Sequence, residues 1–243
     1  MSVRPPLEIA ANSLASALAA QAGGADRIEL CENLGEGGCT PSFGTIAAAR
    51  DRLQVPLYVL IRPRGGDFHY EREECEVMLR DIETCVRLGC DGVVIGALDA
   101  AGDVDMDVCR ALVGAAGSLG ITFHRALDVA RDPLRALDAA IELGCERVLT
   151  SGGQADALAG ADAIATLVRH AAGRIRVMAG AGVDSGNIAT LRARSHADEF
   201  HASAGALRRS SMRHRTALPG LAPDWRQSDR DIVAALRAQL QLH

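Results

Sequence analysis

The sequence has 243 residues, of which 48% are hydrophobic and 3% aromatic, and it carries a formal net charge of -5 at pH 7. This length and apolar content suit one domain covering residues 1–243, whereas the negative charge and the scarcity of aromatic side chains exclude nucleic acid as an expected partner. No apolar run approaches the roughly 20 residues that span a bilayer, and residues 1–6 lack the apolar stretch of a signal peptide, so we expect a cytoplasmic protein without a membrane partner.

Short segments rich in apolar and β-branched residues recur along the chain, and each precedes a stretch of Ala and Leu with helical period. Their starts are roughly 20 to 35 residues apart, the spacing that one strand, one helix and two loops require. The eight predicted strands cover residues 7–10, 27–30, 57–61, 92–95, 121–123, 147–150, 176–179 and 199–201. Repeated units of this kind predict an α/β fold, a (β/α)8 TIM barrel.

Glycines end several of the predicted helices, as Gly89 and Gly144 do shortly before a strand. An open doubly wound sheet is the alternative fold, but its dinucleotide-binding glycine motif does not follow the first strand. We therefore expect no nucleotide cofactor. Beyond the eighth strand, residues 218–228 contain two prolines, a glycine and the single tryptophan, Trp225. This composition predicts an irregular excursion before a last helix at residues 229–240.

Alternation within the strands separates residues that face the outer helices from residues that face the barrel lumen. Apolar residues take the outward positions, while the inward positions hold carboxylates, a guanidinium, imidazoles and a thiol. These lumen residues are Glu8, Glu29, Cys31, Arg62, His124 and His201. Barrel enzymes place their active sites at the carboxyl ends of the strands. Glu8, Glu29, Arg62 and His124 are therefore candidate catalytic residues, with His124 as the general acid or base.

Each of these candidates also has a purely structural interpretation. Glu8 and Glu29 could pair with Arg62 or Arg147 in an ion network inside the barrel. His124 could be a hydrogen-bonded core histidine, and a free buried cysteine is often only a small apolar residue. The seven cysteines are odd in number and form no C-x-x-C pair, so we expect reduced thiols rather than disulfides or a structural zinc site.

Two loops, after the seventh and eighth strands, are candidates for binding a ligand through the backbone. Gly180 and Gly182 lie in the first loop and Ser203 begins the second, and in TIM barrels this pair of loops often presents amide N–H groups to a phosphate. Arg62 and Arg64 follow the third strand and add guanidiniums suited to carboxylate or phosphate. We therefore expect a small anionic ligand. The candidate ligand-binding residues are Arg64, Ser151, Gly180, Gly182, His201 and Ser203.

Six motifs in chain order resemble those of the CutC family. They are Glu29-Leu30-Cys31, Glu36 to Ser42, Ile61 to Phe68, Thr122 to Ala126, Leu149 to Gly152, and Met178 to Val183. The likeness extends from about residue 7 to residue 215 and is far more specific than any single motif. It implies a cytoplasmic TIM barrel that self-associates as a homodimer, is named for copper homeostasis and binds Cu(I) through cysteine.

The sequence departs from the family pattern at the implied copper site. Family members often carry a cysteine at the end of strand one, close to the cysteine that ends strand two, and the matching residues here are Ala10 and Cys31. Because Cu(I) prefers soft thiolate ligands, Cys31 would need a second donor. Cys39 is one candidate, and His124 or His201 is the other.

Three functions remain open at this point. The first is a copper-binding protein of copper homeostasis, and the second is an enzyme that acts on a small phosphorylated or carboxylated substrate without a copper role. The third is an interaction scaffold, in which Trp225 and the tail form a homodimer surface. The first predicts that Cys31→Ser weakens copper binding, whereas the second predicts that Arg62→Ala weakens ligand binding.

Overall fold

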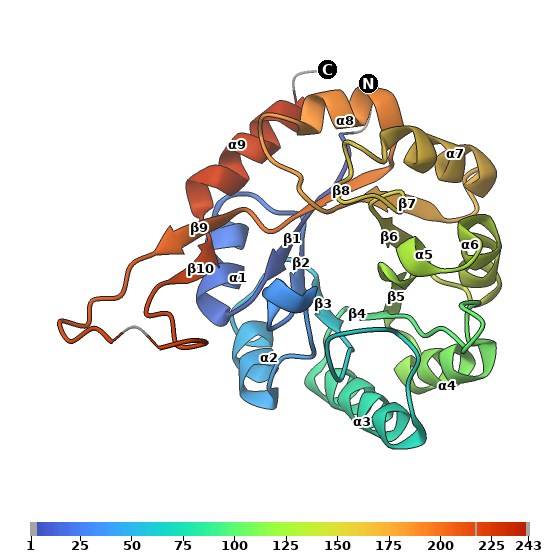
Figure 1. Ribbon diagram of the computed structural model, residues 1–243, viewed down its shortest axis with the longest axis horizontal. Coiled ribbons are helices and arrows are strands. Elements are labelled where there is room, and N and C mark those ends of the chain that lie inside the picture. The colour runs from blue at the N-terminus through green and yellow to red at the C-terminus, as the bar shows by residue number, and fades with distance from the viewer. Residues whose placement is uncertain (1–3, 217, 242–243) are drawn as a thin grey trace.

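The computed structural model describes residues 4–216 and 218–241, so residues 1–3 of the amino-terminal segment discussed above lie outside the described part. Eight parallel strands close into a barrel in chain order, with β8 paired to β1 (Figure 1). The strands are β1 (Leu7–Ala11), β2 (Arg27–Leu30), β3 (Leu57–Leu60), β4 (Gly92–Ile95), β5 (Gly120–Phe123), β6 (Arg147–Thr150), β7 (Arg176–Ala179) and β8 (Glu199–Ala202). The chain is a (β/α)8 TIM barrel, and the predicted strands are confirmed to within one residue at each end.

Helices surround the barrel (Figure 1). They are α1 (Leu14–Ala22), α2 (Phe43–Arg50), α3 (Arg72–Leu88), α4 (Met106–Ala116), α5 (Ala126–Val129), α6 (Pro133–Glu142), α7 (Ala161–Ala171), α8 (Ile188–Ser195) and α9 (Arg230–Gln241), with one 3-10 turn, η1 (Leu34–Glu36). Local sequence sets their ends, since Ser13 caps α1 by accepting the Ser16 N–H and Gly89 ends α3 with a φ of 69°. Within the described residues, no helix is long and apolar enough to cross a membrane.

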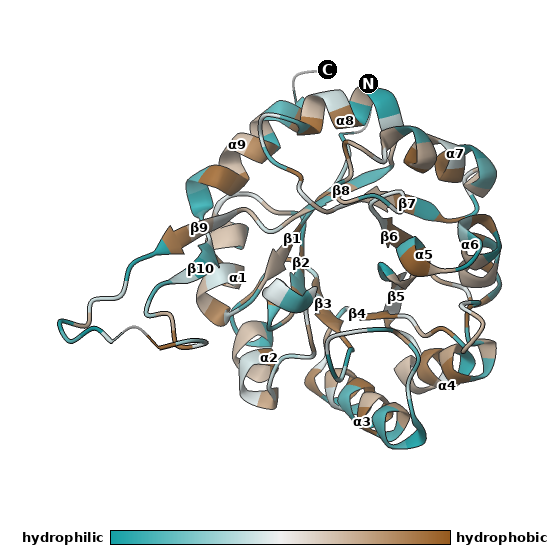
Figure 2. Cartoon of the chain, viewed as in Figure 1, coloured by the Kyte–Doolittle hydropathy of each residue, from teal (hydrophilic) through white to brown (hydrophobic). Residues whose placement is uncertain are grey.

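Apolar residues pack on both sides of the barrel wall. The outward-facing residues, such as Ile9, Ile28 and Phe200, are fully buried against the helices. Hydrophobic and hydrophilic residues share the outer helices (Figure 2), which is the pattern of helices that bury one face. A smaller apolar cluster lies inside the lumen and comprises Ala10, Cys31, Tyr58, Leu60 and Val94. The predicted division between inward and outward positions is therefore confirmed.

The segment after β8 differs from the prediction. Two antiparallel strands, β9 (Gly205–Arg208) and β10 (Trp225–Ser228), form an arm that projects from the barrel (Figure 1). The expectation of irregular structure for residues 218–228 is therefore wrong for 225–228. Strand β10 is specified by pairing with a distant segment, which a local pattern does not reveal. Helix α9 begins and ends one residue later than predicted.

Candidate functional site

A cavity of about 240 Å³ opens at the carboxyl ends of the barrel strands. We call it the mouth cavity. Seven of the predicted site residues line it, namely Glu29, Cys31, Arg62, His124, Gly182, His201 and Ser203. Five others lie outside its lining, namely Glu8, Cys39, Arg64, Ser151 and Gly180. The barrel therefore gathers residues from both ends of the sequence around one space, at the end of the barrel where such folds perform chemistry.

Arg62 is a buried cation that pairs with no carboxylate in the part of the chain that the structure describes. Its Nη1 donates to the carbonyl oxygens of Glu36 at 2.8 Å and Gly38 at 2.7 Å, and its Nη2 donates to Gly66 O at 2.7 Å. The guanidinium also lies over the Phe68 ring, 4.9 Å from its centroid. Within the described residues, Arg62 forms no ion pair, and its buried Nε has no hydrogen-bond partner. Backbone carbonyls thus fix the orientation of this charge but leave it uncompensated.

His124 is held in one protonation state by its surroundings. Its Nδ1 accepts the Ala126 N–H at 3.2 Å, which requires the proton of the neutral ring to be on Nε2. Burial and the Arg62 charge lower the pKa of His124 to about 3, so the ring is neutral near pH 7. The buried Nε2 has no partner in the described part of the chain. In this tautomer His124 is a fixed hydrogen-bond donor through Nε2–H, and its predicted role as general acid or base stays a prediction.

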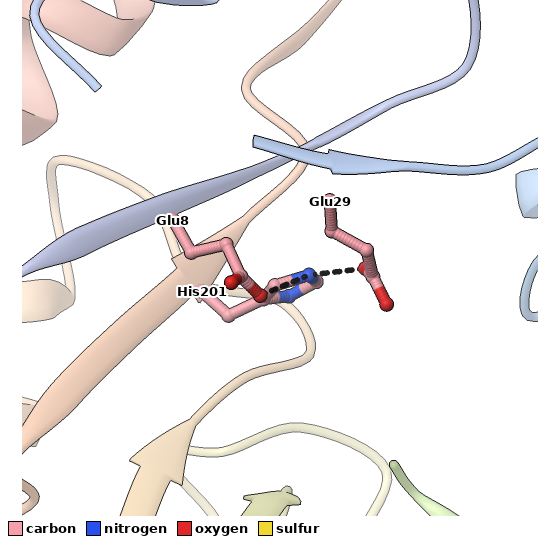
Figure 3. A group of neighbouring side chains, drawn as sticks. All are labelled: Glu8, Glu29 and His201. Atoms are coloured by element: carbon pink, nitrogen blue, oxygen red, sulfur yellow. Dashed lines mark hydrogen bonds and ion pairs between the residues drawn. The ribbon is translucent and has the colours of Figure 1, made fainter. Parts of the chain in front are cut away.

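Three neighbouring strands bring Glu8, Glu29 and His201 together (Figure 3). His201 Nε2 lies 2.7 Å from Glu29 Oε2 and 3.8 Å from Glu8 Oε1. Burial lowers the pKa of His201, but the two carboxylates raise it more, and the net shift is upward. Burial likewise raises the pKa of Glu8, while Arg27 and His201 lower it further than burial raises it. Glu8 therefore carries negative charge beside the imidazole.

An ion network fills the lumen beneath this cluster and includes two of the residues named for it, Glu8 and Arg147, together with Arg27 and Glu199. Arg27 donates to both Glu8 and Glu199, and Arg147 donates to Glu199 at 3.1 Å. The expected pairing of Glu8 or Glu29 with Arg62 is wrong, because Arg62 bonds backbone carbonyls instead. Arg27 is two residues before Glu29 on β2 and so points into the lumen as Glu29 does. Strand alternation could therefore have predicted Arg27 as a lumen residue.

The thiols do not fit the implied Cu(I) site at the ends of β1 and β2. Burial raises the pKa of the Cys31 thiol well above its usual range, and Glu29 and Cys39 raise it further. The Cys31 Sγ lies 3.8 Å from Ala11 O, and the neighbouring Ala10 offers no donor atom. Cys39 exchanges backbone hydrogen bonds with Glu32 and lies outside the cavity lining. A protonated thiol beside a methyl group is not the pair of thiolates that Cu(I) prefers.

Three predicted ligand-binding residues are engaged elsewhere. Arg64 forms ion pairs with Glu74 at 2.5 Å and Asp67 at 3.0 Å. Ser151 donates to Asp128 at 2.9 Å and is fully buried. The Gly180 N–H donates to Thr150 O at 3.0 Å, so this amide is not free for a ligand.

Arg125 is a cavity residue that the strand pattern missed, because it follows the end of β5. Its Nε contacts Asp128 at 2.7 Å and its Nη2 donates to Ser151 at 3.0 Å. It lines the mouth cavity, and its side chain is 42% exposed, so the charge can reach an incoming molecule. Its position directly after His124 in the sequence could have indicated that it lies at the cavity.

The loop after β7 contributes Ala181, Gly182 and Val183 to the cavity lining. Ala181 and Gly182 have φ values of 86° and 65°, the left-handed conformation that a non-glycine residue adopts only with strain. Within the described residues, the N–H groups of Gly182 and Val183 have no hydrogen-bond partner, and both residues line the cavity. These amides can donate to an anion without disrupting any existing bond.

Comparisons with known proteins agree with the motifs. The CutC family model matches residues 6–206. A CutC family protein of Xylella fastidiosa (strain 9a5c) is 65% identical over 204 residues, covering 84% of this chain and 76% of the relative. A CutC family protein of Xanthomonas campestris pv. campestris (strain B100) is 57% identical over 237 residues, covering 97% and 98%.

A solved structure of a CutC protein is also similar to this chain. The CutC protein of Streptococcus agalactiae, described as a proposed copper homeostasis protein, superposes with a TM-score of 0.78 at 32% identity and covers 82% of this chain and 98% of that structure. Thiamine phosphate pyrophosphorylase of Pyrococcus furiosus, at 14% identity and a TM-score of 0.60, covers 97% of this chain and 95% of that structure and shares the fold alone.

Proposed function

The chain belongs to the CutC family, and we propose that it serves in copper homeostasis as a binding protein for a small anionic molecule held in the mouth cavity. The description of the Streptococcus agalactiae relative supports the copper homeostasis part. The binding part rests on Arg62, a buried guanidinium with no carboxylate partner in the described residues.

A buried charge is normally paired, because removal from water costs several kcal/mol per ion when nothing compensates it. Three carbonyl groups stabilise the Arg62 guanidinium through their dipoles, but they bring no countercharge. Arg62 lines the mouth cavity and has 4% of its surface exposed. An anion in the cavity would supply the missing charge and an acceptor for Nε.

The other free donors favour an oxyanion. His124 Nε2–H and the amides of Gly182 and Val183 all belong to cavity residues without present partners. Phosphate and carboxylate groups accept several hydrogen bonds at once, and backbone amides with a guanidinium are the usual donors to them. A cavity of about 240 Å³ is below the roughly 300 to 1,000 Å³ of sites for drug-sized ligands. The ligand class is therefore a small phosphate or carboxylate.

Direct Cu(I) binding at Cys31 is not part of this proposal. Ala10 supplies no donor, Cys31 is protonated by burial, and His124 carries its proton on the nitrogen that has no partner. A Cu(I) titration of the wild type and of Cys31→Ser separates the two ideas. Stoichiometric binding that is lost in the variant would make copper the ligand and overturn the proposed anion.

Isothermal titration calorimetry with inorganic phosphate and with malonate tests the proposed function. Hydrogen bonds to charged groups contribute about 1.5 to 3 kcal/mol, so Arg62→Met should weaken binding of the better probe by roughly 10- to 100-fold. Arg64→Met is the matched control, because Arg64 lies outside the cavity lining and already pairs with Glu74 and Asp67. Equal losses in the two variants, or none in Arg62→Met, would refute the assignment.

A second candidate is an enzyme that acts on the same anion, and the His124 donor favours it. A fixed N–H group in a buried cavity stabilises negative charge that develops on a substrate oxygen. NMR spectra of small phosphate esters and carboxylates incubated with the protein would reveal turnover. In that case His124→Gln should slow turnover more than it weakens binding, whereas unchanged spectra in the wild type would leave the binding function alone.

A further inference from the structure

Glu8, Glu29 and His201 form a donor set that the anion site does not use. They lie on β1, β2 and β8, which are adjacent in the barrel, and Glu8 and His201 are direct register partners. One oxygen of each carboxylate and one imidazole nitrogen lie within 4.8 Å of one another. Ligands of a transition metal are about 3 to 4 Å apart when each bond is about 2.1 Å. Small side-chain rotations, with release of the His201 Nε2 proton to solvent as the metal binds, would therefore place all three donors around one ion.

The second observation is that one buried carboxylate oxygen of Glu8 has no hydrogen-bond partner among the described residues. Its side chain is fully buried, yet Oε1, the oxygen 3.8 Å from His201 Nε2, has no hydrogen-bond partner in the described residues. The opposite oxygen, Oε2, accepts from Arg27, which fixes the carboxylate plane. Buried carboxylate oxygens without partners are rare and costly. Figure 3 shows one oxygen of each carboxylate directed at the same imidazole nitrogen, Nε2 of His201.

From these observations we propose that Glu8, Glu29 and His201 bind one divalent first-row cation, such as Mn²⁺ or Zn²⁺. One imidazole nitrogen and two carboxylate oxygens are the donors that these ions accept, and the set contains no thiolate to select Cu(I). Glu29 and His201 line the mouth cavity while Glu8 does not, so the open coordination positions face the cavity. The site stands on its three side chains and does not depend on the proposed anion.

Arg27 and Glu199 complete the surroundings of the cation. Arg27 bridges Glu8 and Glu199, so it orients the Glu8 carboxylate without reaching the ion itself. Carboxylates and imidazoles that ligate metals usually have such an orienting partner, and its loss typically costs 10- to 100-fold in metal affinity. Loss of a direct ligand should cost at least as much.

The test begins with protein dialysed against a chelator and then titrated with MnCl₂, with free Mn²⁺ measured by electron paramagnetic resonance. We expect one ion per chain and at least a tenfold weaker affinity in Glu8→Gln and in Glu29→Gln, which keep the side-chain shape. Arg64→Met is the control, because Arg64 lies outside the cavity lining, and it should bind as the wild type does. Circular dichroism verifies that each variant folds. If Glu8→Gln does not fold, Glu29→Gln, at the cavity edge, carries the test.

A Co²⁺ absorption spectrum of the wild type gives a readout that needs no variant. Nitrogen and oxygen ligands give only weak visible bands, whereas a thiolate adds intense charge-transfer absorption in the near ultraviolet. Absence of a stoichiometric site would overturn the proposal. So would affinity unchanged by both glutamate substitutions, or a thiolate band that disappears in Cys31→Ser.

Discussion

Replacement of Arg27 by methionine should destabilise the barrel, because this residue is the shared partner of two buried carboxylates. Arg27 donates to Glu8 and to Glu199, and both acids are almost fully buried. Methionine keeps much of the volume but has no donor. Glu199 would retain Arg147 at 3.1 Å, whereas Glu8 would retain, among the described residues, only the His201 ring at 3.8 Å. The substitution therefore removes ion-pair stabilisation mainly from the Glu8 carboxylate.

Removal of one partner from a buried ion pair typically costs about 3 to 5 kcal/mol. For a chain of this length, each kcal/mol lowers the melting temperature by about 2 to 4 °C, so Arg27→Met should melt about 6 to 20 °C below the wild type in calorimetry at pH 7. Arg80→Met is the control. Arg80 pairs with Glu76 at 2.7 Å on the exposed face of α3, and such a surface pair contributes little to stability.

Addition of Glu8→Gln to Arg27→Met should restore part of the lost stability, since no unpaired carboxylate is then left at that position. Circular dichroism confirms that all variants keep the barrel. If Arg27→Met melts no lower than Arg80→Met, the buried network contributes little and the reasoning is refuted.

Three further predictions concern His124, its packing and the arm. Because burial and Arg62 lower the pKa of His124 to about 3 from its ordinary 6.5, only the unfolded chain gains a proton as the pH falls below 6.5. The contribution of His124 to the free energy of unfolding is therefore fully present above pH 6.5 and declines toward pH 3. Between pH 6.5 and 5, the free energy of unfolding measured in urea should fall by about 2 kcal/mol more in the wild type than in His124→Gln. Gly96→Ala should weaken phosphate binding, because a Cβ at Gly96 would lie 2.6 Å from His124 Nδ1 and displace the ring. Trp225 on β10 is 51% exposed, and we expect a homodimer in sedimentation that Trp225→Glu dissociates.

Each of these predictions has a clear contrary result. Parallel urea midpoints of the wild type and His124→Gln across this pH range would mean that His124 titrates normally in the native state. Gly114→Ala is the control for Gly96→Ala, because nothing lies within 4 Å of the added Cβ and a helix gains about 1 kcal/mol from this change. Equal phosphate affinity in the two alanine variants would exclude the proposed ring displacement. A wild type that sediments as a monomer would remove the arm as a self-association surface.

Sequence alternation predicted on which side of the barrel wall each residue lies, but not its height in the lumen. Glu8, Glu29, His124 and His201 all face inward as expected. Because strands in a barrel are tilted and staggered, the partner of Glu8 is its register neighbour Arg27, not Arg62 at the mouth. Register depends on contacts between strands that are distant in sequence. A single sequence therefore predicts which residues face inward but not which of them pair with one another.

The height of each group also distinguishes the charges that are paired inside the barrel from the buried groups to which we assign ligands. Arg27, Arg147 and Glu199 satisfy one another, so the lower layer of the lumen is complete without a ligand. Within the described residues, Arg62 Nε and His124 Nε2, which belong to cavity residues, have no hydrogen-bond partner, and neither does Glu8 Oε1, which lies 3.8 Å from His201 Nε2. Each unsatisfied buried group costs about 1 to 3 kcal/mol, and an anion and a divalent ion bound together would relieve all three.

The two proposed ligands should therefore reinforce each other. A cation held by Glu29 and His201 at the cavity surface would attract an anion that also contacts Arg62, since all three residues line the same cavity. By linkage, Mn²⁺ should tighten phosphate binding by the same factor as phosphate tightens Mn²⁺ binding. Calorimetry of each ligand with and without the other measures both factors, and Glu29→Gln should abolish the coupling. Independent binding would mean that the unpaired donors and the unpaired carboxylate serve separate ligands.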